Sequence, residues 1–127
     1  VWPGTESLSG IRYLLDENMP HAVRDQLLLR QPAIQVLTPG IEHGPVLGTS
    51  DPDLLLWIER EGMILVTRNR RSMPTHLQAY LQAGSHVPGI FLVRPQAAMR
   101  EVIDDLVLIW ELSQVEEYRD RIVYLPL

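Results

Sequence analysis

The sequence predicts a three-layer α/β/α domain with a mainly parallel sheet, and three observations lead to this fold class. Short apolar runs that suit buried strands alternate along the chain with longer segments of helical periodicity. Clusters of Gly and Pro separate many of these segments. The run at residues 63–67 is apolar almost throughout, which is typical of a strand covered on both faces of a parallel sheet. Together they indicate βαβ units with helices on both sides of the sheet.

The first half of the predicted domain consists of two strands, a helix and a long loop. Residues 11–15 form the first apolar run, and Pro20 suits the first turn of a helix that continues to about residue 30. Residues 34–37 read as the second strand. Residues 38–50 are rich in Gly and Pro and therefore predict a loop long enough to be functional. The helix is expected to bury one face, made of Ala22, Val23 and Leu27.

A second helix is expected to begin at Asp51, with the carboxylate as its cap and Pro52 at the first helical position. Gly62 is expected to end it, and the strand at residues 63–67 follows. A polar segment at residues 68–72 comes directly after that strand. The buried face of this helix is expected to contain Leu54, Leu55 and Ile58.

The remaining chain predicts a helix at about residues 74–83, a strand at 89–93, a long apolar helix at 97–113 and a closing edge strand at 121–125. Residues 11–127 therefore fit one domain. Residues 1–10 show no periodicity and are expected to be a flexible leader or an expression remnant. No window suits a membrane helix and no signal sequence is apparent, so we expect a cytoplasmic protein with no membrane association.

Composition excludes several kinds of chemistry. The chain has no cysteine, which rules out thiol catalysis, disulfides and thiolate zinc sites. It has no lysine, so Schiff-base catalysis and the lysine of a phosphate-binding loop are excluded as well. The net charge of −5 argues against non-specific nucleic-acid binding over the whole surface.

Polar side chains gather where two of the predicted strands end. Asp16, Glu17 and Asn18 directly follow the first strand, and residues 67–71 follow the strand that begins at Met63. If these strands are neighbours, their carboxyl ends share one crevice, which is where open α/β sheets bind ligands. Carboxylate and amide oxygens suit a hard divalent cation, which in turn binds phosphate. The pattern favours a site that cuts or binds nucleic acid.

Three stretches resemble the PIN-like domains, in particular a compact bacterial branch predicted to contain toxin-type ribonucleases. Residues 12–20 read Arg-Tyr-Leu-Leu-Asp-Glu-Asn-Met-Pro, residues 48–55 read Gly-Thr-Ser-Asp-Pro-Asp-Leu-Leu, and residues 64–69 read Ile-Leu-Val-Thr-Arg-Asn. The resemblance extends from about residue 12 to residue 93. It implies a PIN-like, Rossmann-like fold and an acidic cluster that binds Mg²⁺ or Mn²⁺ to cleave RNA.

On this resemblance Asp16 matches the first aspartate of the family, and Asp51 matches the aspartate that opens the helix before the Thr-bearing strand. Asn69 stands where that branch usually has an aspartate, and Arg71 stands where it has another acid. The implied metal ligands and catalytic groups are Asp16, Asp51 and Asn69, with Glu17 and Asp53 as outer-shell acids. Arginines of the 68–71 loop are expected to hold the phosphate, namely Arg68, Arg70 and Arg71.

Most of these residues also have a purely structural interpretation. Asp51 is a good helix cap in any protein, and Asp53 is favoured by the helix dipole. Asp16 could be satisfied by an ion pair with an arginine, and Asn18 could cap the first helix. The arginines after residue 67 could simply pair with nearby acids.

Three functional hypotheses therefore stay open. The first is a metal-dependent ribonuclease, such as the toxin component of a toxin–antitoxin pair, with RNA as substrate and a cognate antitoxin as protein partner. The second is a catalytically inactive PIN-like module that binds RNA or a protein. The third is a small-ligand or regulatory α/β domain. The apolar residues 123–127 are equally consistent with a homodimer contact and with core packing.

Overall fold

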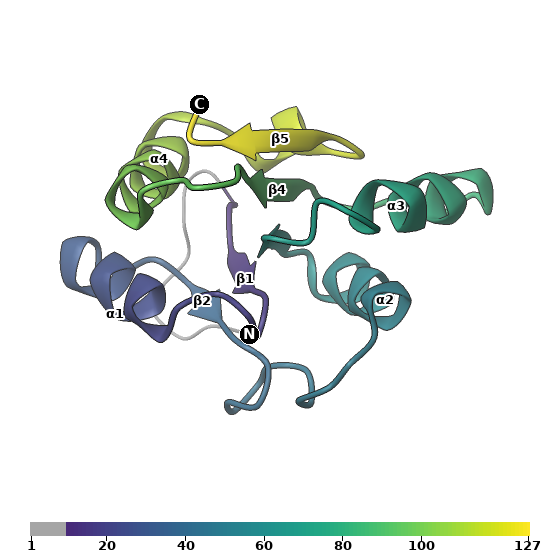
Figure 1. Cartoon of the computed structure of the whole chain (residues 1–127), viewed down its shortest axis with the longest axis horizontal. Helices are drawn as coiled ribbons and strands as arrows, with labels where there is room; N and C mark the ends of the chain where they lie inside the picture. The colour runs from purple at the N-terminus through teal and green to yellow at the C-terminus, as the bar shows by residue number, and fades with distance from the viewer. Residues whose placement is uncertain (1–9) are drawn as a thin grey trace.

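A five-stranded, all-parallel sheet forms the centre of the computed structural model, which describes residues 10–127 (Figure 1). Four helices cover the sheet, so the predicted α/β/α class is confirmed. The expected leader at residues 1–10 lies outside the described residues except for Gly10. The strands are β1 (Tyr13–Leu15), β2 (Val36–Leu37), β3 (Ile64–Thr67), β4 (Ile90–Val93) and β5 (Ile122–Leu125). The helices are α1 (His21–Arg30), α2 (Asp51–Glu61), α3 (Met73–Gln82), α4 (Met99–Leu112) and the short 3-10 helix η1 (Val115–Tyr118).

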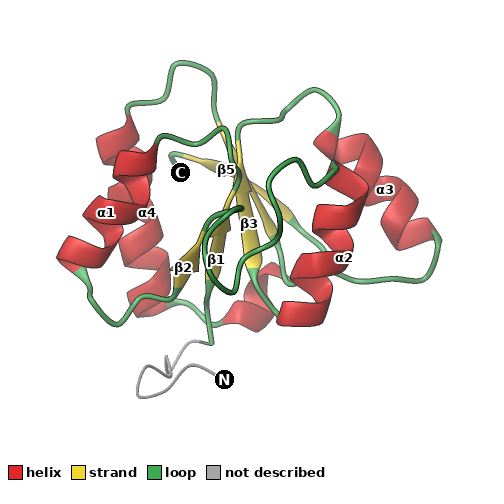
Figure 2. Cartoon of the chain, turned by 90° about the horizontal axis from the view of Figure 1, so that it is seen from below, coloured by secondary structure: helices red, strands yellow, loops and turns green. Residues whose placement is uncertain are grey.

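The helices pair on opposite faces of the sheet. Helices α1 and α4 lie together on one face, and α2 and α3 lie together on the other (Figures 1 and 2). Strands β1 to β4 therefore bury both sets of their alternating side chains, whereas the edge strand β5 leaves Tyr124 exposed. In β1, Leu15 packs toward α1 and α4, whereas Leu14 packs toward α2 and α3. This double coverage explains why the strands are apolar at successive positions.

The strand order β2-β1-β3-β4-β5 places a topological switch point between β1 and β3. The chain leaves the carboxyl end of β1 toward β2 on one side of the sheet, and it leaves the carboxyl end of β3 toward β4 on the other side. The two connections therefore diverge between β1 and β3. A crevice at that position is the usual ligand site of a doubly wound sheet. The sequence-based expectation that the strands preceding Asp16 and Arg68 are neighbours is thus confirmed.

One connection departs from the simplest parallel topology. The steps from β3 to β4 and from β4 to β5 run in the same direction across the sheet, yet α3 and α4 lie on opposite faces. The β4–α4–β5 connection must therefore have the opposite hand from β3–α3–β4, whereas crossovers of this kind are nearly always of one hand. The hydroxyl of the buried Tyr13 donates to Leu106 O at 2.7 Å and so ties α4 to the β1 side of the sheet.

Several local predictions are confirmed and several are wrong. Leu54, Leu55 and Ile58 are buried, β5 is an edge strand, and Gly62 ends α2 in the left-handed conformation at φ 72°. The cap of α2 is Ser50 rather than Asp51, because the Ser50 hydroxyl accepts from Asp53 N at 3.4 Å. Helix α1 begins one residue after Pro20, and Ala22 is exposed. Within residues 10–127, no helix has both the length and the apolar character needed to cross a bilayer.

Candidate functional site

The site is built on the register between β1 and β3. Leu15 pairs with Val66, so the next residues along the two strands, Asp16 and Thr67, lie side by side. Asp16 N donates to Val66 O at 2.9 Å, which continues the ladder beyond the end of β1. Because side chains alternate along a strand, Asp16 and Thr67 both point to the α2–α3 face. The Thr67 hydroxyl donates to Asp16 Oδ2 at 2.9 Å.

Asp16 is a buried acid whose hydrogen bonds come from neutral groups. Its exposed fraction is 8%, and its Oδ1 accepts from Glu17 N at 2.8 Å. Burial raises the pKa of Asp16; the bonds from Thr67 and Glu17 N oppose this rise, and the charges of Asp51 and Glu17 add to it. No ion pair within residues 10–127 joins Asp16 to an arginine. The structure therefore does not support the interpretation of Asp16 as a salt-bridged structural acid.

Asp51, the first residue of α2, lies near Asp16. Its side chain is 23% exposed, and its negative charge acts on Asp16. The Asn69 side-chain amide donates to Asp51 Oδ2 and also to Ser72 Oγ, the latter at 2.8 Å. The structure thus brings together the two acids that the sequence predicted to meet.

Asn69 supports Asp51 and is itself held by its surroundings. Its Oδ1 accepts from Ser72 N at 3.3 Å, and its backbone N donates to Thr67 Oγ1 at 3.1 Å. Turning the amide over would place its oxygen against the Asp51 carboxylate and its nitrogen against the Ser72 N–H, both unfavourable pairs. In this arrangement Asn69 offers its oxygen to Ser72 instead of to a cation. A continuous chain of hydrogen bonds therefore links Asp16, Thr67, Asn69 and Asp51.

Two residues of this site are not among the sequence-based candidates. Thr67 is the last residue of the predicted strand at residues 63–67, and this position after an apolar run marks it as buried. His76, in the first turns of α3, places its Nε2 3.9 Å from Asp51 Oδ2. A protonated His76 would pair with Asp51. The signal for His76 is weak in the sequence, because it depends on α3 lying beside α2.

The two outer-shell candidates lie apart. The Glu17 side chain is exposed and accepts from Gly48 N at 3.1 Å, so it fastens the 38–50 loop to the end of β1. Asp53 is exposed and lines a hollow on the outside of α2, together with Trp57 and Arg60. Nothing in its contacts brings Asp53 to Asp16. Asn18 does not cap α1, since that helix has Pro20 at the cap and no side-chain cap bond.

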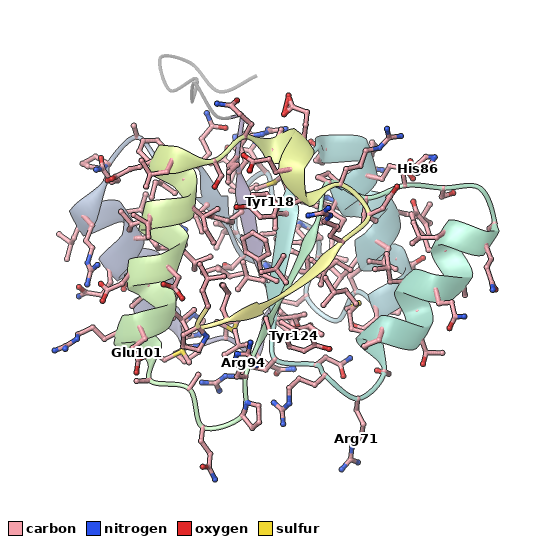
Figure 3. The ribbon with its side chains drawn as sticks, turned by 90° about the horizontal axis from the view of Figure 1, so that it is seen from above. Arg71, His86, Arg94, Glu101, Tyr118 and Tyr124 are labelled. Carbon is pink, nitrogen blue, oxygen red and sulfur yellow. The ribbon has the colours of Figure 1, made fainter. Side chains whose placement is uncertain are left out.

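The arginines after β3 divide into two groups. Arg68 and Arg70 line a pocket of about 280 Å³ that also includes Arg94 from the loop after β4. Arg71 is exposed, does not line this pocket, and points away from the body of the protein (Figure 3). Within the described part of the chain, none of these four arginines forms an ion pair with a carboxylate. The interpretation of Arg68, Arg70 and Arg71 as partners of nearby acids is therefore not supported.

The donor set at this edge suits a cation that brings its own water and phosphate ligands. Across residues 10–127 there is no group of three or more acidic or histidine side chains that could form an all-protein cage. Mg²⁺ does not need one, because it commonly binds through one or two carboxylates and completes its shell with water and substrate phosphate. Asp16 and Asp51 provide such a pair, since their mutual repulsion in a buried setting is relieved by a cation.

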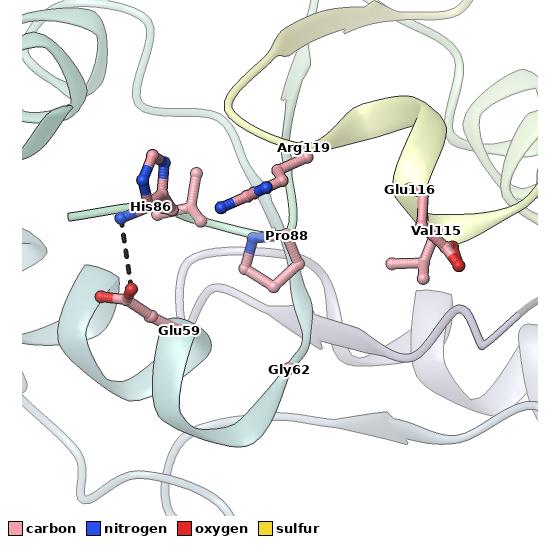
Figure 4. Close-up of a pocket in the computed structure, with 8 residues that line it drawn as sticks. Glu59, Gly62, His86, Pro88, Val115, Glu116 and Arg119 are labelled. Carbon is pink, nitrogen blue, oxygen red and sulfur yellow. Dashed lines mark hydrogen bonds between the residues drawn. The ribbon is translucent and has the colours of Figure 1, made fainter. Parts of the chain in front are cut away.

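A separate pocket of about 340 Å³ lies at the opposite, amino edge of the sheet (Figure 4). Glu59 on its wall accepts from the Tyr80 hydroxyl and, at 3.2 Å, from His86 N. His86 Nδ1 lies 2.7 Å from Asp120 Oδ2. These polar groups join the loop before β4 to α2 and to the turn before β5, so they already have a structural role. The carboxyl edge is therefore the better candidate for chemistry.

Comparisons with family models, with curated proteins and with solved structures find no match to this chain.

Proposed function

We propose that this protein is a PIN-like, metal-dependent ribonuclease that cleaves RNA phosphodiesters at the carboxyl edge of its sheet. The observation that carries the proposal is that Asp16 and Asp51 lie close enough at the topological switch point for their negative charges to repel each other, and neither is paired with an arginine. Such an arrangement is costly unless a positively charged ligand binds between the two acids at some stage.

Each residue of the site has a task in this proposal. Asp16 and Asp51 would hold the divalent cation, Mg²⁺ or Mn²⁺. When bound, the cation supplies an activated water and neutralises charge on the phosphate. Thr67 and Glu17 N orient Asp16, and Asn69 orients Asp51. Arg68 and Arg70, on the same edge of the sheet, attract the phosphate backbone of the RNA.

The proposal is tested by cleavage of single-stranded RNA with Mn²⁺ or Mg²⁺. Asp16→Asn and Asp51→Asn should each reduce the rate by at least about a hundredfold, the scale for loss of an essential catalytic group. The matched control is Asp25→Asn, an exposed aspartate on α1 that should retain the wild-type rate. Cleavage that survives equally in Asp16→Asn and in the control would refute the proposal.

A second candidate is a catalytically inactive PIN-like module that binds RNA or a protein partner such as an antitoxin. The observation that favours it is Asn69, which replaces an expected acid and donates to Asp51 instead of presenting an oxygen to the crevice. This candidate predicts partner binding that is unaffected by EDTA and by Asp16→Asn. Thermal unfolding with divalent cations separates the two, because only a folded-state cation site raises the melting temperature.

A further inference from the structure

The pocket that contains Arg68, Arg70 and Arg94 lies on the same carboxyl edge of the sheet as Asp16 and Asp51. Arg68 directly follows Thr67, whose hydroxyl contacts Asp16. The opposite wall comes from the loop after β4, which carries Arg94 and Gln96 and leads into α4 at Met99. Figure 3 shows Arg94 at the edge of the sheet opposite to His86 and Tyr118. The pocket and the acids thus share one edge of the sheet, with Arg68 following Thr67 along the chain, and have no residue in common.

Three guanidinium groups surround this pocket without acidic partners in the described part of the chain. Arg94 is held in place, because its Nε donates to Pro126 O at 2.9 Å and its Cζ lies 5.5 Å from the centre of the Tyr124 ring. Arg68 rests with Nη2 3.7 Å from Met99 Sδ. These contacts leave most guanidinium N–H groups available. In a chain of net charge −5, such a local excess of positive charge favours an anionic ligand.

Helix α4 adds to the positive potential, because its N-terminus forms part of the pocket wall. Met99 is the first residue of this fourteen-residue helix and lines the pocket. The cap position is Ala98, whose side chain cannot accept a hydrogen bond from the first backbone N–H groups. A helix end of this kind donates to phosphate oxygens.

Gln96 gives an independent indication that the pocket is more than a by-product of folding. It lies in the turn Arg94–Ala97, where Ala97 N donates to Arg94 O at 3.3 Å, and its φ of 60° is one that glycine adopts with less strain. A glutamine side chain nevertheless occupies this position and lines the pocket. Its amide can donate to a phosphate oxygen.

We propose that this pocket binds a phosphate group of the RNA strand whose neighbouring phosphodiester lies at Asp16 and Asp51. The inference rests on the proposed function for the identity of the strand. The recognised chemistry is that of phosphate held by arginines, a side-chain amide and a helix N-terminus. The pocket thereby positions the strand, while the acidic crevice carries the chemistry.

The test is fluorescence anisotropy with a 3′-labelled single-stranded RNA of about ten nucleotides, over a series of salt concentrations in EDTA. EDTA removes divalent cations, so binding is measured without cleavage. The double variant Arg68→Gln/Arg94→Gln should weaken binding by about tenfold or more, the scale for loss of a charge-assisted hydrogen bond. The slope of log K against log salt should become shallower by about 0.7 for each phosphate that the variant no longer neutralises.

Arg121→Gln is the matched control for the single pocket variant Arg70→Gln, since each removes one positive charge; Arg121 lies at the amino edge of the sheet, and its replacement should preserve affinity and slope. Arg70→Gln is the second pocket variant; its exposed side chain can be replaced without disturbing packing. Gln96→Gly relieves the backbone turn and should weaken RNA binding without loss of thermal stability. Equal affinity and slope in the pocket variants and in Arg121→Gln would overturn the inference. Binding as predicted, with no cleavage under any cation, would instead refute the proposed ribonuclease activity alone.

Discussion

Replacing Thr67 by valine is expected to destabilise the protein far more than the loss of one hydroxyl suggests. Valine keeps the branched shape and removes the side-chain oxygen, and Thr67 is fully buried. Two hydrogen bonds disappear together. One is donated to the Asp16 carboxylate, and the other is accepted from Asn69 N.

The magnitude follows from these two bonds. A hydrogen bond to a charged group contributes about 1.5–3 kcal/mol, and a partly buried N–H without an acceptor costs about 1 kcal/mol. Thr67→Val should therefore lower the free energy of unfolding by about 3 kcal/mol at neutral pH. For a domain of this size that corresponds to a drop of roughly 10 °C in melting temperature.

Urea unfolding followed by circular dichroism measures this destabilisation, with Thr67→Ser as the matched control. Serine keeps the hydroxyl and removes one buried methyl group, which costs about 1 kcal/mol. The Thr67 bond also lowers the pKa of Asp16, so Thr67→Val should move the Asp16 titration to higher pH. The reasoning is refuted if valine and serine cost the same and the titration of Asp16 does not move.

Three further predictions concern the acids and their supports. The pKa of Asp16 is raised in the folded protein by burial and by Asp51 and Glu17, so the folded state binds this proton more tightly than the unfolded state does. The contribution of Asp16 to stability should therefore decline as pH rises from the ordinary pKa of 3.8 through the raised value, and Asp16→Asn should lack this decline. Urea titrations of both proteins between about pH 3 and pH 8 test it: the stability of Asp16→Asn relative to the wild type should rise with pH, and a fall contradicts the reasoning. Ser50→Ala should cost about 0.5–1 kcal/mol in urea unfolding because Ser50 caps α2, and a Ser50→Ala variant as stable as the wild type would disprove this assignment. Asn69→Asp replaces the donor to Asp51 by another acid, so it should lower the melting temperature in EDTA. Saturating Mg²⁺ should then raise the melting temperature of this variant by more than it raises that of the wild type. An equal rise in both proteins would count against the cation site.

The fold could be predicted from the sequence because local patterns and tertiary arrangement agree. Continuous apolar runs such as residues 63–67 arise where helices cover both faces of a strand, and Gly62 ends α2 through a backbone conformation that suits glycine. The sequence favours the wrong cap for α2 because Ser50 and Asp51 are both good caps and adjacent. The opposite hand of the β4–α4–β5 connection has no local signal, because it depends on which face of the sheet α4 covers, and α4 packs there against α1, which is distant in sequence.

The candidate site is predictable only in part. Asp16 and Asp51 could be expected to meet at the carboxyl edge of the sheet. Asp16 follows a strand that ends at this edge, and Asp51 begins a helix that starts there. The roles of Asn69 and His76 depend on side-chain directions and on the contact between α2 and α3, which spacing does not reveal. Arg94 and Gln96 join the arginine pocket only through the pairing of β3 with β4.

The central claim is that Asp16 and Asp51 share a cation, and anomalous X-ray diffraction from crystals soaked in Mn²⁺ tests it most directly. The account predicts an anomalous peak within coordination distance of carboxylate oxygens of both residues, absent from crystals of Asp16→Asn. A crevice without such a peak in the wild type, in a protein that still cleaves RNA with Mn²⁺, would contradict it.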